Sequence, residues 1–177
     1  MFEFQHLSGI PPEGIALQTR RGRDIRNSLG LVLTERHFRL FELLRQKHGA
    51  NWELRKPPSG EYNCAGHVWA SRRVCIYEEA DWRWILADDG YRQAFSPVAD
   101  DLVVYVEREQ GILHIGRVLE LRAGLVQGAA RIPWVVSKWS DVAGEACHYV
   151  HDHPFRDFGF MVSIEYWTDR PASEESL

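Results

Sequence analysis

A chain of 177 residues with 45% hydrophobic and 12% aromatic side chains is long and apolar enough to fold as one globular domain, which excludes general intrinsic disorder. Its 21 basic and 25 acidic residues give a formal net charge of −4, so no basic excess predicts binding to nucleic acid. The three cysteines are too few, and too irregularly spaced, for a disulfide framework.

The amino-terminal sequence lacks a basic start followed by a continuous apolar run, and no window reaches the roughly 18 apolar residues of a membrane span. The sequence therefore predicts a cytoplasmic protein that does not contact a membrane, with delivery by a dedicated secretion route as the alternative. A basic cluster at Arg20, Arg21, Arg23 and Arg26 could meet an anionic partner, but a solvated face is the simpler interpretation.

The first half of the chain predicts an irregular arm followed by helices. Glycines and prolines interrupt residues 1–33, which we expect to pack as an arm on the domain. Apolar side chains at helical spacing predict a helix over residues 34–48, and prolines mark a loop over 50–61. We expect two further helices, one beginning at or beside Cys64 and one running from about Glu78 to Leu86.

The second half predicts strands, because β-branched and aromatic residues alternate with polar ones there. Helices followed by an antiparallel meander indicate an α+β domain over residues 34–169, with a flexible tail over 170–177. A turn at Gln110-Gly111 would join the first two strands in a hairpin. The expected strands are 103–106, 112–121, 134–138, 146–150 and 160–167.

Cys64 is the candidate nucleophile. A helix N-terminus presents unsatisfied N–H groups and a partial positive charge, which lower the pKa of a thiol placed there. Asn63 is a suitable N-cap, and the small residues Ala65 and Gly66 would leave the sulfur accessible. The backbone N–H of Cys64 can help to bind an oxyanion. The alternative, which also describes the other two cysteines, is a small apolar residue buried in the core.

His114 is the candidate base, because a histidine on a strand beside the helix start can hold its ring at a fixed height opposite the thiol. Strand alternation predicts that His114 shares a face with Ile112, Gly116 and Val118. Gly116 would then leave open space beside the imidazole. A structural histidine without a catalytic role is the alternative.

The region around the cysteine reads Tyr62-Asn63-Cys64-Ala65-Gly66-His67-Val68, which resembles the cysteine motif of NlpC-type and CHAP-type papain-like amidases and peptidases. Residues 101–105 resemble the strand that a Gly-Asp pair opens in that family, although Asp100 replaces the glycine. Residues 113–118 resemble the histidine strand. The resemblance, over roughly residues 60–140, implies a papain-like fold and a cofactor-free hydrolase of the thiol protease or amidase class that acts on a peptide or protein.

The resemblance further implies a third polar residue that orients the histidine ring from the next strand. Ser137 is preferred over Lys138, because a hydroxyl can accept a hydrogen bond from an imidazole N–H and an ammonium cannot. His148 is a third possibility. We expect the Tyr62 hydroxyl to contribute to the oxyanion site, together with Asn63 and Lys138 on the substrate side.

The expected reaction is hydrolysis of a peptide, isopeptide or amide bond. His114 would accept the Cys64 proton, the sulfur would attack a carbonyl, and water or an amine would resolve the thioester. In a thiolate–imidazolium pair, the pKa of the thiol would fall below its free value of about 8.5. The alternative is a catalytically inactive papain-like scaffold that binds a protein through an aromatic surface containing Trp82, Trp84 and Trp139.

A second cluster of histidines follows near the carboxyl terminus. His148, His151, Asp152 and His153 are side chains that could bind a divalent metal. Pro154 interrupts the segment, and the spacing matches no known ligand pattern, so a loop of surface histidines is the favoured interpretation. We expect no metal site there.

Overall fold

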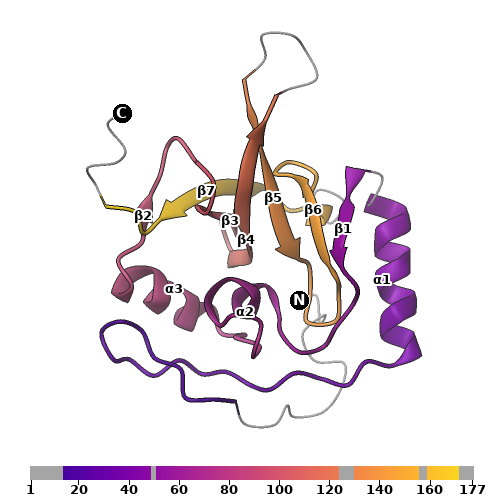
Figure 1. The fold of residues 1–177 in the computed structure, drawn as a ribbon, viewed down its shortest axis with the longest axis horizontal. Coiled ribbons are helices and arrows are strands. Elements are labelled where there is room, and N and C mark those ends of the chain that lie inside the picture. Colours follow the sequence, from indigo (N-terminus) through magenta and orange to yellow (C-terminus); the bar gives the residue numbers. More distant parts are fainter. Residues whose placement is uncertain (1–13, 49–50, 124–129, 156–158, 172–177) are drawn as a thin grey trace.

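The computed structural model describes residues 14–48, 51–123, 130–155 and 159–171. Within these ranges the chain forms three α-helices and one seven-stranded sheet (Figure 1), which confirms the α+β class expected from the sequence. Among the helices described, none is long and apolar enough to cross a membrane. The elements are α1 (Glu35–His48), β1 (Glu53–Lys56), α2 (Cys64–Trp69), α3 (Glu79–Asp88), β2 (Arg92–Gln93), β3 (Leu102–Glu107), β4 (Gly111–Arg122), β5 (Ile132–Lys138), β6 (Glu145–Tyr149) and β7 (Val162–Thr168).

The sheet is antiparallel throughout, with strand order β1-β6-β5-β4-β3-β7-β2. Strands β3 to β6 form the expected meander, and β7 returns beside β3. Two short edge strands, β1 and β2, were not expected. The four residues of β1 are all exposed, so they carry no apolar alternation, and pairing with β6 alone makes them a strand.

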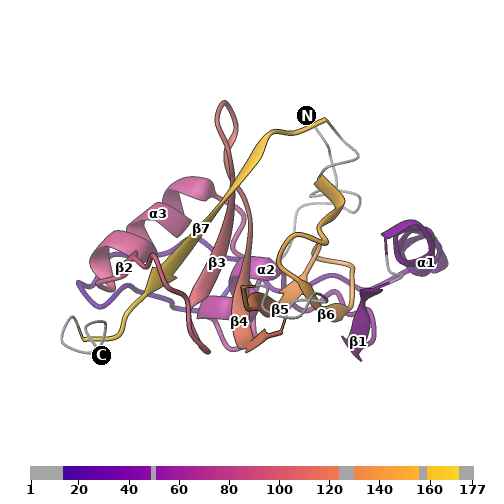
Figure 2. The same ribbon diagram turned by 90° about the horizontal axis from the view of Figure 1, so that it is seen from above.

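Each face of the sheet carries its own apolar cluster. Helices α2 and α3 pack against one face, on a cluster that includes Leu102, Val104 and Ile115. Val103 and Tyr105 alternate to the other face, which the chain after β6 covers. Figure 2 shows α3 and this later segment on opposite sides of β3. The cores therefore follow directly from the period of two in β3.

Strand β4 departs from simple alternation at its start. Tyr105 pairs with His114, but the next β3 residue, Val106, pairs with Ile112, so Leu113 is an extra residue in a bulge. Ile112 consequently joins the cluster of Ile115 under the helices. The expectation that Ile112 shares a face with His114 is wrong, because one inserted residue reverses the face of everything before it.

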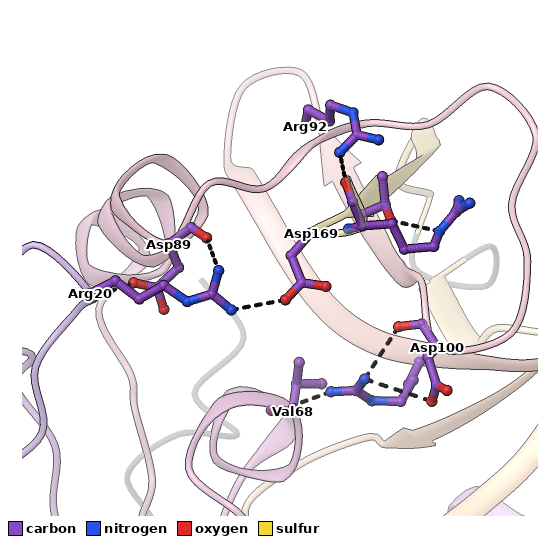
Figure 3. Close-up of polar contacts among 9 residues, drawn as sticks. Arg20, Val68, Asp89, Arg92, Asp100 and Asp169 are labelled. Carbon is purple, nitrogen blue, oxygen red and sulfur yellow. Dashed lines mark hydrogen bonds and ion pairs between the residues drawn. The ribbon is translucent and has the colours of Figure 1, made fainter. Parts of the chain in front are cut away.

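The described part of the arm, from residue 14 to residue 33, packs along the domain. Arg20 donates to Asp89 at the end of α3 through its backbone N–H and its guanidinium, and it pairs with Asp169 after β7 (Figure 3). Arg23 and Arg26 pair with Asp88 and Asp81 of α3. Three arginines of the basic cluster therefore hold the arm to the domain by binding carboxylates of the domain.

The carboxyl-terminal end of the described chain is also held to the domain. Thr168 closes β7, and the Arg170 guanidinium makes two bonds with the Asp101 carboxylate, at 2.9 and 3.1 Å. The tail expected over 170–177 thus begins with a bonded residue. Its remainder, 172–177, lies outside the described residues.

Candidate active site

Helix α2 begins at Cys64, as the sequence predicted. The Asn63 Oδ1 accepts from the Gly66 N–H at 2.9 Å and from the Ile76 N–H at 3.1 Å, while its Nδ2 donates to the Ile76 carbonyl at 2.8 Å. Asn63 therefore caps the helix and ties it to the following loop, which confirms the predicted N-cap. Its side-chain carbonyl oxygen and one of its two N–H donors are thus used within the protein, and Asn63 is 5% exposed.

The Cys64 side chain is only 7% exposed. Burial raises the pKa of its thiol to about 11, although the backbone N–H groups of Ile115 and Ala65, which face the sulfur, favour the thiolate. The expectation of a thiol pKa below the free value is therefore wrong. Helix α2 has only six residues. The partial positive charge at its N-terminus lowers the thiol pKa by less than the loss of water around the sulfur raises it.

The small residues after Cys64 serve close packing. Ala65 is fully buried, and a Cβ placed on Gly66 would lie 1.7 Å from the carbonyl oxygen of Val74. The expectation that these residues leave the sulfur accessible is therefore wrong. They allow the loop after α2 to run against the helix.

The His114 ring is buried against aromatic side chains. It stacks on Trp139 with ring centroids 4.3 Å apart, and its centroid lies 5.7 Å from that of Tyr105. Burial, with a smaller effect from the nearby His148, holds the pKa of His114 well below its usual value. The Cys64 thiol faces the backbone N–H of Ile115, the residue after His114. The Cys64 and His114 side chains lie on opposite faces of the sheet. Cys64 belongs to the cluster of Ile115 under the helices, whereas His114 pairs with Tyr105 and stacks on Trp139 in the other cluster. The structure therefore does not bring the predicted nucleophile and base together.

Ser137 lies beside Gly116 on the neighbouring strand and is completely buried. A Cβ on Gly116 would lie 2.6 Å from the Ser137 Oγ, so Ser137 fills the space that we expected to be open beside the imidazole. Its hydroxyl has no hydrogen-bond partner among the described residues, and it does not hold the His114 ring. The orienting role predicted for Ser137 is absent from this geometry.

The other residues expected at the oxyanion or substrate are also committed to the protein. The Tyr62 hydroxyl donates its single proton to Glu145 Oε1 at 2.6 Å. The Lys138 Nζ donates to the carbonyls of Ser59, at 2.7 Å, and Ala143, and burial lowers the pKa of Lys138 to about 8.

Trp139 was expected on an exposed aromatic surface, and sequence reasoning missed its contact with His114. Its ring stacks on His114 and lies 4.8 Å from His148 and 5.7 Å from Trp52. His148, the third orienting candidate, shares a hydrogen bond of 2.8 Å between its Nδ1 and the Tyr149 carbonyl, and it meets this cluster through Trp139. The signal in the sequence was a large aromatic side chain directly after the Ser137-Lys138 pair.

The histidine-rich segment is mostly internal. His148 is fully buried and His153 is 8% exposed, so the interpretation as surface histidines is wrong for both and fits only the exposed His151. The His153 ring lies 5.3 Å from Tyr105. Across the described ranges, no three His, Cys, Asp or Glu side chains come close enough to hold a metal ion.

The stack predicts how Trp139 controls His114. Replacing Trp139 with Leu should let water reach the imidazole and raise the pKa of His114 toward its usual value, because burial is the main cause of its low pKa. Trp139→Phe keeps an aromatic cover and should raise it less. NMR titration of the His114 ring measures both, and an unchanged His114 pKa in Trp139→Leu would contradict this role of the stack.

Comparisons of the chain with protein-family models, with curated proteins and with solved structures found no match. The resemblance to NlpC-type and CHAP-type proteins therefore rests on the sequence motifs around Cys64 and His114.

Proposed function

We propose that the protein is a thiol-dependent hydrolase of the peptidase, isopeptidase or amidase type, with Cys64 as nucleophile and His114 as base. The observation that supports this most is the position of Cys64. It is the first residue of a capped helix, and its sulfur faces the backbone N–H of Ile115 on β4, the strand that carries His114 on its other face. A papain-like arrangement of helix and sheet is part of the same proposal.

The resting pair in this mechanism is neutral. Burial keeps the thiol protonated, with a pKa of about 11, and keeps the imidazole unprotonated. The step requires the His114 imidazole to reach the α2 side of β4. There it accepts the thiol proton as the sulfur bonds to the carbonyl carbon, and the imidazolium then gives that proton to the leaving group. Water resolves the thioester, again with His114 as base. The backbone N–H groups that face the sulfur supply oxyanion donors.

A small acyl donor tests the proposal without knowledge of the natural substrate. Wild-type protein mixed with p-nitrophenyl acetate should release a burst of p-nitrophenolate and carry an acetyl thioester on Cys64, detected by peptide mass spectrometry. Cys64→Ala should abolish the burst, and His114→Ala should slow it by about 100-fold, because that is a typical contribution of a general base.

Cys147→Ala is the matched control, since Cys147 is 8% exposed and thus about as accessible as Cys64. Its burst should equal that of the wild type. A burst of full amplitude in Cys64→Ala would disprove the assignment of the nucleophile.

The inactive scaffold remains the second candidate, because the buried Cys64 has the high thiol pKa of a core cysteine. Its aromatic surface, however, does not exist as expected. Trp82 is 2% exposed and donates its indole N–H to the Ile76 carbonyl, and Trp139 belongs to the cluster on the other face of the sheet. No burst from the wild-type protein would favour the scaffold.

A further inference from the structure

A network of charged and polar side chains is buried beside α2. Its centre is Glu145 of β6, which is completely buried. Glu145 accepts hydrogen bonds from the Tyr62 hydroxyl at 2.6 Å, from the Arg72 Nε at 2.5 Å and from the Arg72 Nη2 at 3.2 Å. The His67 Nε2 lies 3.0 Å from the Arg72 Nη2 and 3.7 Å from the carboxylate.

This network holds the nucleophile's helix on both sides. Tyr62 precedes α2 by two residues, His67 is within it, and Arg72 follows it by three. All three side chains meet the same strand, β6, through Glu145. Because α2 has only six residues, fixing both flanks fixes the orientation of Cys64 relative to the sheet.

The backbone is strained where it delivers Arg72. Ser71 has a φ of 50° and Arg72 a φ of 66°, in the left-handed region that costs a residue with a side chain roughly 1–2 kcal/mol. The Arg72 N–H bonds to the Gly66 carbonyl at 3.0 Å, while its guanidinium bonds to Glu145. Strain of this kind persists where the surroundings over-determine it, and it concentrates at functional sites.

Stability alone does not account for the pair. Removing the Glu145 carboxylate and most of the Arg72 side chain from water costs about as much as their attraction returns, and an apolar pair of similar volume is often as stable or more so. Burial opposes ionisation of Glu145, yet the hydrogen bonds from Arg72 and Tyr62 lower its pKa to about 2. Both side chains of the pair therefore stay charged. Their hydrogen bonds fix the direction in which Arg72 approaches Glu145, and an apolar pair could not do this.

We propose that Glu145 and Arg72 are positioning residues, which hold the two flanks of α2 and thereby fix the Cys64 sulfur against β4. This inference rests on the proposed function. It also assigns Tyr62 a new role, as a hydrogen-bonded support of the Cys64 loop in place of an oxyanion donor.

The single variants Glu145→Gln and Arg72→Met should slow the p-nitrophenyl acetate burst by about 10- to 100-fold, since a misplacement of about 1 Å can cost a factor of that size. Arg72→Met should also lower the melting temperature, because it leaves the buried Glu145 carboxylate without its partner. Glu145→Gln should lower it less, since the Arg72 side chain is 32% exposed. Tyr62→Phe removes only the hydroxyl and should slow the burst by about 10-fold. Glu42→Gln with Arg45→Met, a pair on the exposed face of α1, is the matched control and should leave the burst unchanged.

The double variant Glu145→Gln with Arg72→Met separates positioning from stability. With the buried carboxylate also removed, its melting temperature should recover relative to Arg72→Met, whereas the burst should stay slow.

Two outcomes would overturn the inference. The burst could recover together with the melting temperature in the double variant, or folded Glu145→Gln or Tyr62→Phe could retain the wild-type burst. In these cases the proposed nucleophile and base stand. Absence of a Cys64-dependent burst from the wild type would remove the proposed function, and the inference with it.

Discussion

Acidification from about pH 6.5 to about pH 4 is expected to destabilise the native protein by several kcal/mol. Burial lowers the pKa of His67 and that of His148 to about 4, and it holds the pKa of His114 well below 6.5. In the unfolded chain these histidines titrate near their usual pKa of about 6.5. A difference of two to three pKa units corresponds to roughly 3 kcal/mol for each of His67 and His148.

The sign follows from proton uptake. Above pH 6.5 these three histidines are neutral in both states, so they contribute no pH dependence. As the pH falls toward 4, the unfolded chain binds protons that the folded protein cannot accept, and the free energy of unfolding decreases. Glu145, with a pKa of about 2, extends this loss below pH 4.5. Asp81 and Asp141, whose pKa values burial raises, oppose it in the carboxyl range.

Urea unfolding at a series of pH values between about 7 and 4 measures the effect. His148→Gln removes one buried imidazole and should make the dependence shallower, whereas His151→Gln, at an exposed position, should leave its slope unchanged. A free energy of unfolding that stays constant down to pH 5 would show that water reaches these rings in the native state.

The elements of the fold were predictable where the signal is local. Apolar spacing located the helix at 35–48, and alternation located β3 to β7, because these patterns arise from the period of each element. The bulge at Leu113 and the edge strand β1 were not predictable. Both are defined by pairing with a partner strand, and a single sequence does not state its pairing register.

The features of the candidate site also separate into those that could be predicted from the sequence and those that could not. The N-cap at Asn63 and the helix start at Cys64 could be predicted, since capping depends on neighbours within a few residues. Burial depends on distant parts of the chain, so neither the raised pKa of the Cys64 thiol nor the Trp139 stack on His114 could be predicted. The Glu145–Arg72 pair joins residues 73 positions apart, and only the folded chain brings them together.

Gly66→Ala is expected to destabilise the protein by more than about 3 kcal/mol, enough to prevent folding of a marginally stable domain. The Cβ would lie 1.7 Å from the Val74 carbonyl oxygen and 3.2 Å from the Tyr62 Cβ. The first of these distances is far inside van der Waals contact, and the atom it meets belongs to the backbone, which cannot turn aside as a flexible side chain can.

The loop that carries Val74 has little freedom to retreat from the helix. On one side of it the Arg72 N–H bonds to the Gly66 carbonyl, and on the other Cys75 exchanges backbone hydrogen bonds with Ser28, at 2.9 and 3.0 Å. Moving the Val74 carbonyl would break these bonds. Alanine is a better helix former than glycine by about 1 kcal/mol, but this gain is smaller than the cost of the overlap.

Urea denaturation of Gly66→Ala, with Gly90→Ala as the control, shows whether the steric overlap outweighs the better helix propensity of alanine. Gly90 has a φ of 81°, and no described atom lies within 4 Å of the position that its Cβ would take, so its substitution should cost only the roughly 1 kcal/mol of left-handed strain. If Gly66→Ala were as stable as the wild type, the loop would have to lie farther from α2. The close contact that fixes Arg72 beneath the helix would then be absent, and Cys64 would lose the support that we propose for it.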